Sequence, residues 1–186
     1  QTILPVFALL YWDTMRQEKR DWKNILVLSL LLSGLALTHY RILIFAFALI
    51  PAYFILEVRR KTFLPWFVHM AGLGLGSALL FLPWFNHLFT GRLTLQFSRY
   101  VLTSPDQVTD LVWQLNNLDR FERFMPVPIW LLLGLVTIWG FVRRKRFIIL
   151  IGLWWLLILL VTNPHWLGLP GVGLITNFAI AIAVYI

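Results

Sequence analysis

The side chains best suited to chemistry are three consecutive polar residues, His39, Tyr40 and Arg41, inside a largely apolar stretch over residues 25–56. Ionisable groups at membrane depth are costly, so they usually mark function or specific pairing. An arginine can hold a phosphate through two parallel hydrogen bonds, and a nearby histidine can donate to the same phosphate or shuttle a proton. We therefore expect these residues to bind a phosphate-bearing ligand. The alternative is that Arg41 extends to lipid headgroups and His39 caps a turn.

Composition places these residues in a membrane protein. The chain is 60% hydrophobic and 13% charged, whereas an average soluble domain is about 25% charged. A net charge of +8 would suggest nucleic acid in a soluble protein. Here the basic residues flank apolar runs, so we expect membrane lipids as partners and no nucleic acid. The chain has no cysteine, which excludes disulfides and thiolate metal sites, and we predict no metal site in this chain.

Most of the lysines and arginines fall into three short clusters, within residues 16–23, 59–61 and 143–146. Basic loops between apolar runs indicate the cytoplasmic side of a multi-pass protein, which for this chain predicts the inner (cytoplasmic) membrane. A single helix over residues 25–56 would be about 48 Å long, but the hydrocarbon core is only about 30 Å thick. Because basic clusters flank both ends, we predict a hairpin of two short spans whose tip, residues 39–41, lies on the outer face.

The predicted fold class is all-α, a polytopic transmembrane helical bundle of about seven spans with an amphipathic helix on its outer face. We expect one transmembrane domain over residues 1–186, and we expect it to be an internal piece of a larger membrane protein. Within residues 62–85, Gly72 and Gly76 form a small-xxx-small pair, which predicts a close approach of two helices. The remaining spans are expected at residues 3–12, 126–142, 147–162 and from 175 onward.

Residues 86–125 form the long non-spanning segment, with acids and bases in balance, as suits an outer loop. Ser104, Pro105 and Asp106 predict a helix start there, and the residues that follow predict an amphipathic helix. His87, Arg92 and Arg99 open the segment and could line a groove for an anionic lipid head. The alternative is a solvated loop that contacts headgroups.

Other polar residues have simpler interpretations beside the functional ones. His69 lies within a predicted span, and we expect it to be hydrogen-bonded inside the bundle. Asn163 and His165, followed by glycines, could close over a site, but a plain Gly/Pro turn is favoured. No acid lies deep in a span, because Glu57 borders a basic cluster; this weighs against proton- or sodium-coupled transport.

Short paired spans joined at an outer tip by Leu37-Thr38-His39-Tyr40-Arg41, followed by a basic inner loop and a long outer segment, resemble the GT-C superfamily. These are polytopic glycosyltransferases that use polyprenyl-phosphate sugars, including bacterial mannosyl- and arabinosyltransferase-like proteins. The resemblance covers most of the chain in layout, and in motif it rests on Thr38, His39 and Arg41.

The resemblance implies transfer of a sugar from a polyprenyl-phosphate donor on the outer face of the cytoplasmic membrane, in the cell envelope. Arg41, with His39 and Arg92, would then hold the donor phosphate and stabilise the leaving group. In such enzymes a carboxylate in the first outer loop acts as base or metal ligand. That loop would precede residue 1, so the catalytic residue is not assigned here, and any divalent cation would be bound by residues outside this chain.

Two other classes of function stay open. A membrane transporter or lipid flippase would use residues 39–41 to line a translocation path. A non-catalytic membrane protein of the cell envelope would use them only as a turn. Inverted repeats or broken helices with central carboxylates would favour transport, and an acidic outer loop upstream would favour the enzyme.

Overall fold

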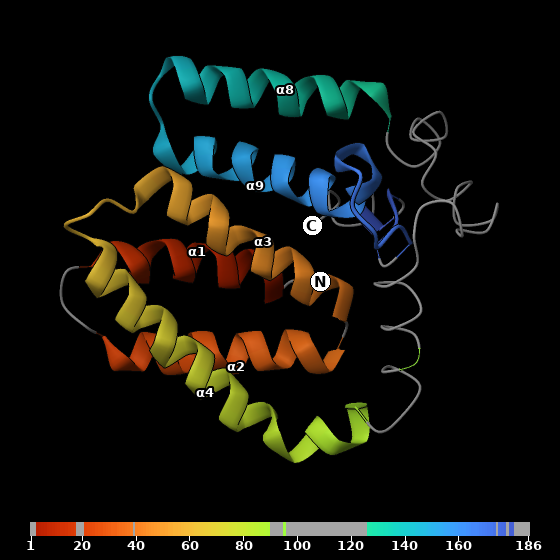
Figure 1. Ribbon diagram of the computed structural model, residues 1–186. Helices are drawn as coiled ribbons and strands as arrows, with labels where there is room; N and C mark the ends of the chain where they lie inside the picture. Colours follow the sequence, from red (N-terminus) through yellow and green to blue (C-terminus); the bar gives the residue numbers. More distant parts are fainter. Residues whose placement is uncertain are drawn as a thin grey trace. The chain divides into compact units, whose positions relative to one another are not determined.

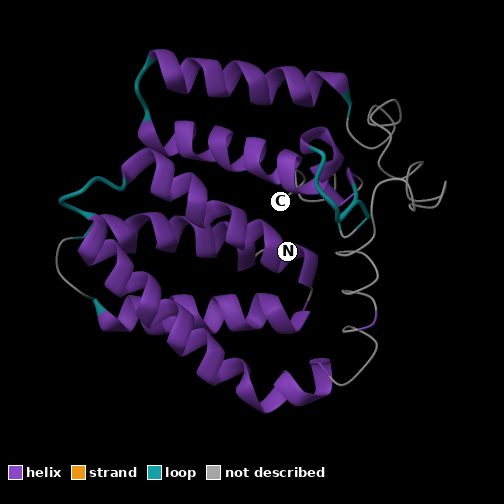
Figure 2. Cartoon of the chain, in the orientation of Figure 1, coloured by secondary structure: helices purple, strands orange, loops and turns teal. Residues whose placement is uncertain are grey.

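In the computed structural model every described element is a helix, as Figures 1 and 2 show. The structure describes residues 3–17, 21–38, 40–89, 95, 126–173, 175–177, 179 and 180, and for residues 40, 41 and 86–89 the backbone alone. The helices are α1 (Ile3–Arg16), α2 (Trp22–Thr38), α3 (Tyr40–Glu57), α4 (Phe63–Phe89), α8 (Val127–Val142), α9 (Arg146–Thr162) and the short 3₁₀ helix η3 (Pro164–Leu167). The all-α class is therefore confirmed for the described residues.

The chain divides into two compact units, Gln1–Asn86 and His87–Ile186. The first contains α1 to α3 and most of α4, and the second contains α8, α9 and η3.

Residues 25–56 form two helices rather than one continuous rod. The chain leaves α2 after Thr38, enters α3 at Tyr40 and returns alongside α2, with α1 packed against both (Figure 1). The predicted hairpin is thus confirmed as a pair of packed antiparallel helices. Its buried side chains are mostly aliphatic, such as Leu28 and Leu35 on α2 and Leu49 on α3.

The first polar loop is shorter than expected, because α1 continues to Arg16 instead of ending at Trp12. Two contacts across one helical turn support the extra residues. The Gln17 side chain donates to Asp13 at 3.3 Å, and the Arg16 guanidinium lies 4.7 Å from the centre of the Trp12 ring.

At the other end of the loop, the Asp21 carboxylate accepts hydrogen bonds from backbone N–H groups at the start of α2, as an N-cap does.

The glycines of α4 allow close packing against α2. A Cβ added at Gly72 would meet Trp22 and Ile25, and one added at Gly76 would lie 2.5 Å from the Ser29 hydroxyl. The close approach predicted for this pair of glycines is therefore confirmed. By contrast, nothing lies within 4 Å of a Cβ added at Gly74, which sits on the opposite face of the same helix.

Helix α4 is longer than expected, since residues 86–89 continue it instead of beginning a loop. Its direction changes in the last turns (Figure 1), where Pro83 removes one backbone hydrogen bond. The rest of the predicted outer segment, including the helix start at Ser104, lies outside the described residues except for Leu95.

In the second unit α8 and α9 form a tight hairpin. The N–H of Lys145 donates to the carbonyl of Gly140, and that of Arg144 to the carbonyl of Phe141, which together make a Schellman motif. Arg144 adopts the left-handed conformation that this motif requires, with φ of 52°. A Cβ added at Gly140 would overlap Ile148, and one added at Gly152 would lie 2.5 Å from the Thr137 methyl group.

Among the described helices, one is long and apolar enough to cross a membrane by itself, over Phe63–Phe85. The apolar helices Trp22–Thr38, Ile42–Glu57, Val127–Val142 and Arg146–Thr162 are shorter.

Candidate functional site

The predicted site residues lie where the structure describes little of their side chains. Tyr40 and Arg41 form the start of α3, and His87 lies in the last turn of α4; the backbone of all three is described. His39, Arg92 and Arg99 lie outside the described residues. The site can therefore be placed from the helices that carry it.

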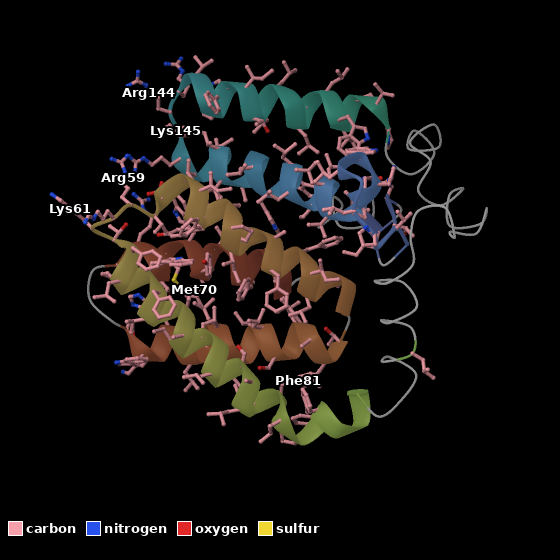
Figure 3. All side chains as sticks on the ribbon, in the orientation of Figure 1. Arg59, Lys61, Met70, Phe81, Arg144 and Lys145 are labelled. Atoms are coloured by element: carbon pink, nitrogen blue, oxygen red, sulfur yellow. The ribbon has the colours of Figure 1, made fainter. Side chains whose placement is uncertain are left out.

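The turn between α2 and α3 lies at one end of the first unit, and the basic loops lie at the other (Figure 1). The end of α1, the start of α2 and the α3–α4 loop share the basic end. Figure 3 shows Arg59 and Lys61 projecting from the α3–α4 loop, away from the helices. Tyr40 and Arg41 are separated from this end by the whole length of α3, 18 residues or about 27 Å.

Contacts between α2 and α4 show that these helices run in the same direction. Ser29 Oγ donates to the carbonyl of Leu73 at 3.3 Å, and Ser33 Oγ, four residues later, donates to the carbonyl of Ser77 at 3.1 Å. Helix α4 therefore runs from the basic end toward the end with the α2–α3 turn.

The start of α3 has the electrostatic character of an anion site. The first backbone N–H groups of a helix have no partner within the helix, and its dipole places partial positive charge there. Arg41 belongs to that first turn by its position in the sequence. The backbone at the start of α3 is therefore compatible with the anionic ligand that the sequence predicts.

His69 is buried, with 1% of its surface exposed, and its Nδ1 lies 2.8 Å from the carbonyl oxygen of Pro65. Because a carbonyl oxygen only accepts, Nδ1 carries the hydrogen of this bond. The expectation that His69 is hydrogen-bonded inside the helices is confirmed.

Asn163 belongs to a buried amide pair that the sequence interpretation missed. Its Nδ2 donates to Asn177 Oδ1 at 2.9 Å, and Asn177 Nδ2 donates back to Asn163 Oδ1 at 3.0 Å. Both side chains are buried, with 0% and 1% of their surface exposed. The pair ties the end of α9 to a residue 14 positions later, and two asparagines flanking a Gly/Pro-rich stretch were the available signal.

His165 lies in η3, next to this amide pair in sequence, and its ring packs edge-on against Trp166. Burial lowers the pKa of His165 below its ordinary value, because the charged form loses hydration. Gly168 ends η3 in the left-handed conformation, with φ of 67°. These features favour the predicted Gly/Pro turn over a loop that closes on a site.

The described residues contain no group of three His, Asp or Glu side chains able to hold a metal ion. Comparison with protein families, curated proteins and solved structures finds no match to this chain.

Proposed function

We propose that this chain is a multi-pass helical bundle of the cytoplasmic membrane, with its basic loops on the cytoplasmic side. Exposed apolar side chains support this. On α8 they cover the sides of the helix that do not pack on α9, and Gly140 is its one buried residue. A helix that is apolar on all sides needs lipid or protein around it. Large apolar residues that are more than 60% exposed on α8 are Leu131, Leu135, Ile138, Phe141 and Val142.

The short helices fit this proposal if the membrane adapts to them. Helix α2, with 17 residues, is about 26 Å long, against a hydrocarbon core of about 30 Å. Local thinning of the bilayer, or packing of α2 and α3 inside the protein, accommodates a difference of this size.

Within that frame we propose that the chain is part of a membrane glycosyltransferase of GT-C type, which takes a sugar from a polyprenyl-phosphate donor on the outer face. Arg41, with His39, holds the donor phosphate, and the first N–H groups of α3 contribute to the same site. The role of these residues is to bind the donor and to stabilise negative charge on the departing phosphate.

The observation that carries the proposal is the position of Tyr40 and Arg41 at the end of the first unit opposite to Arg59 and Lys61. The test of sidedness uses single cysteines in the full-length protein, since this chain has none. A cysteine at Tyr40 should react with an impermeant thiol reagent added to intact cells. A cysteine at Lys61, the matched control, should react only after the cells are opened. Labelling of both from the same side contradicts the proposed topology.

The test of binding uses Arg41→Lys and Arg41→Ala in the full-length protein. Loss of a bidentate phosphate contact should weaken donor binding by about 10-fold or more for alanine. Lysine should recover part of the loss, because it restores the charge without the planar fork. An alanine variant that binds a polyprenyl-phosphate sugar as tightly as the wild type removes the proposed role of Arg41.

A further inference from the structure

The turn between α8 and α9 carries all the lysine and arginine among the described residues of the second unit. Arg143, Arg144 and Lys145 form the turn, and Arg146 is the first residue of α9. All four are exposed, and Figure 3 shows Arg144 and Lys145 at the turn. The last acidic residue of the chain is Glu122, so residues 123–186 contain no Asp or Glu to balance this charge.

One of these cations occupies a backbone position that favours glycine. Arg144 has φ of 52°, the left-handed conformation in which a Schellman motif commonly places glycine. The rule that basic loops face the cytoplasm counts charge over a whole loop, so it does not require a cation at this position. Strained backbone is concentrated at binding and catalytic sites. The arginine therefore points to a ligand that uses its charge.

Exposed apolar surface on α8 leads to this turn. The side chains at 131, 135, 138 and 142 are spaced by three or four residues, so they form one stripe along the helix. Each of them is more than 60% exposed. The stripe is about 17 Å long at 1.5 Å per residue, and its last residue, Val142, directly precedes Arg143. A lipid chain can lie along this apolar stripe while its headgroup reaches the turn.

We propose that the α8–α9 turn binds the headgroup of a phospholipid that carries two phosphates, such as diphosphatidylglycerol, with an acyl chain along the apolar stripe. Clusters of lysine and arginine at the cytoplasmic ends of membrane helices are typical sites for anionic lipids, and arginine can bind a phosphate through two hydrogen bonds. Three cations in one turn exceed the single negative charge of one phosphodiester, so two phosphates match them better. The inference rests on the proposed location in the membrane and not on the proposed donor site.

The test compares two triple variants of the full-length protein, freed of lipid in a non-ionic detergent and titrated with diphosphatidylglycerol. The first variant carries Arg143→Gln, Arg144→Gln and Lys145→Gln. The matched control carries Arg59→Gln, Arg60→Gln and Lys61→Gln, which removes the same charge from the exposed α3–α4 loop. Native mass spectrometry should show binding weakened on the order of 100-fold in the first variant, with little change in the control. Equal weakening in both variants would show general attraction to positive charge and would overturn the proposal.

The headgroup is tested with two further lipids on the wild-type protein. Phosphatidylglycerol carries one phosphate and no other charge, and phosphatidylcholine has no net charge. At equal phosphate concentration, diphosphatidylglycerol should bind about fivefold or more tightly than phosphatidylglycerol, and phosphatidylcholine should bind least. Binding of either comparison lipid as tight as that of diphosphatidylglycerol overturns the proposal.

A single substitution separates binding from folding. Arg144→Gly removes one charge and also relieves the left-handed strain, so it should weaken binding by about fivefold without impairing the fold. Unchanged affinity in this variant overturns the proposal. Both sides of the protein are accessible in detergent, so these titrations do not depend on its orientation. Cysteine labelling at Tyr40 and Lys61 tests the proposed topology separately, and either test can fail without the other.

Discussion

Two helix pairs in this molecule pack closely around glycine, but they are held together in different ways. In α2 and α4, serine hydroxyls donate across the interface to backbone carbonyls of the other helix. In α8 and α9, the Thr137 hydroxyl donates within its own helix, to the carbonyl of Leu133, and the contacts at Gly140 and Gly152 are steric.

The difference follows from chain connectivity. Helices α8 and α9 are joined by a three-residue turn, so a fixed turn and matching surfaces suffice to hold them. Helices α2 and α4 are parallel and separated by the whole of α3, so no short connection fixes their alignment. Interhelical hydrogen bonds, which are favourable where lipid or protein excludes water, supply that alignment.

The largest loss of stability is expected for a substitution between α8 and α9. Gly140→Leu should lower stability by about 3 kcal/mol, because the new side chain would overlap the branched Ile148 side chain and force the helices apart. Gly134→Leu on the same helix is the control, since nothing lies within 4 Å of its added Cβ. Thermal unfolding of both variants measures the contrast, and equal losses would contradict the proposed packing of α8 on α9.

A smaller loss is expected for the corresponding change in the other pair. Gly76→Leu should cost about 2 kcal/mol, less than the change at Gly140, because its neighbour Ser29 is smaller than Ile148; the loss includes the hydrogen bond from the Ser29 hydroxyl to the Leu73 carbonyl. Gly74→Leu, with open space around its added Cβ, should be close to neutral. Hydrogen exchange in peptides from α2 would locate the disruption, and unchanged exchange there in Gly76→Leu would argue against this interface.

The hydrogen bonds themselves are tested by Ser33→Ala, which removes the donor to Ser77. We expect a loss of about 0.6–1.5 kcal/mol, in the range of interhelical hydrogen bonds in membrane proteins. Thr137→Val, which removes a hydroxyl bonded within its own helix, should cost less. If the two variants are equally stable, the polar character of the first interface has no energetic consequence.

The turn between α8 and α9 should become more stable when Arg144 is replaced by glycine. Arg144 has φ of 52°, a conformation that glycine adopts without strain. We expect Arg144→Gly to gain about 0.5–1 kcal/mol. Arg143→Gly should lose stability, because Arg143 has φ of −83°. A gain at Arg144 would indicate that arginine is present there for its charge; a loss at Arg144 would contradict the Schellman geometry.

The smallest expected effect is on pH dependence in the second unit. His165 has a pKa lowered by burial, so the unfolded state binds its proton more readily than the folded state does. Its contribution is constant above the unfolded pKa of about 6.5 and is lost as pH falls below that value. The unfolding midpoint should therefore decline on acidification, and His165→Gln should reduce this decline. An identical pH profile for His165→Gln would show that other groups dominate.

Several elements were predictable because their signals are local. Pro126 and Pro128 mark the start of α8, and the basic residues 143–146 mark the turn before α9, so both helices begin and end within a residue or two of expectation. The end of α1 was not predictable from the apolar run alone, because contacts of Arg16 and Gln17 one turn back extend it.

The candidate site was predictable only in part. The sequence identified residues 39–41 as a polar break and the structure separates two helices there, but the ligand and the partners of these side chains stay predictions. The amide pair of Asn163 and Asn177 required the structure, because a pairing across 14 residues depends on how the intervening turn folds.

By itself, the sequence determined the helical class, the break at residues 39–41 and the clustering of positive charge, because hydropathy and charge act along the chain. The tertiary structure decided that α4 runs parallel to α2, and that α1 meets α4 at Tyr11 and Met70. The physical reason is that packing depends on which helix faces meet in space, and the positions of residues along the chain do not fix those faces.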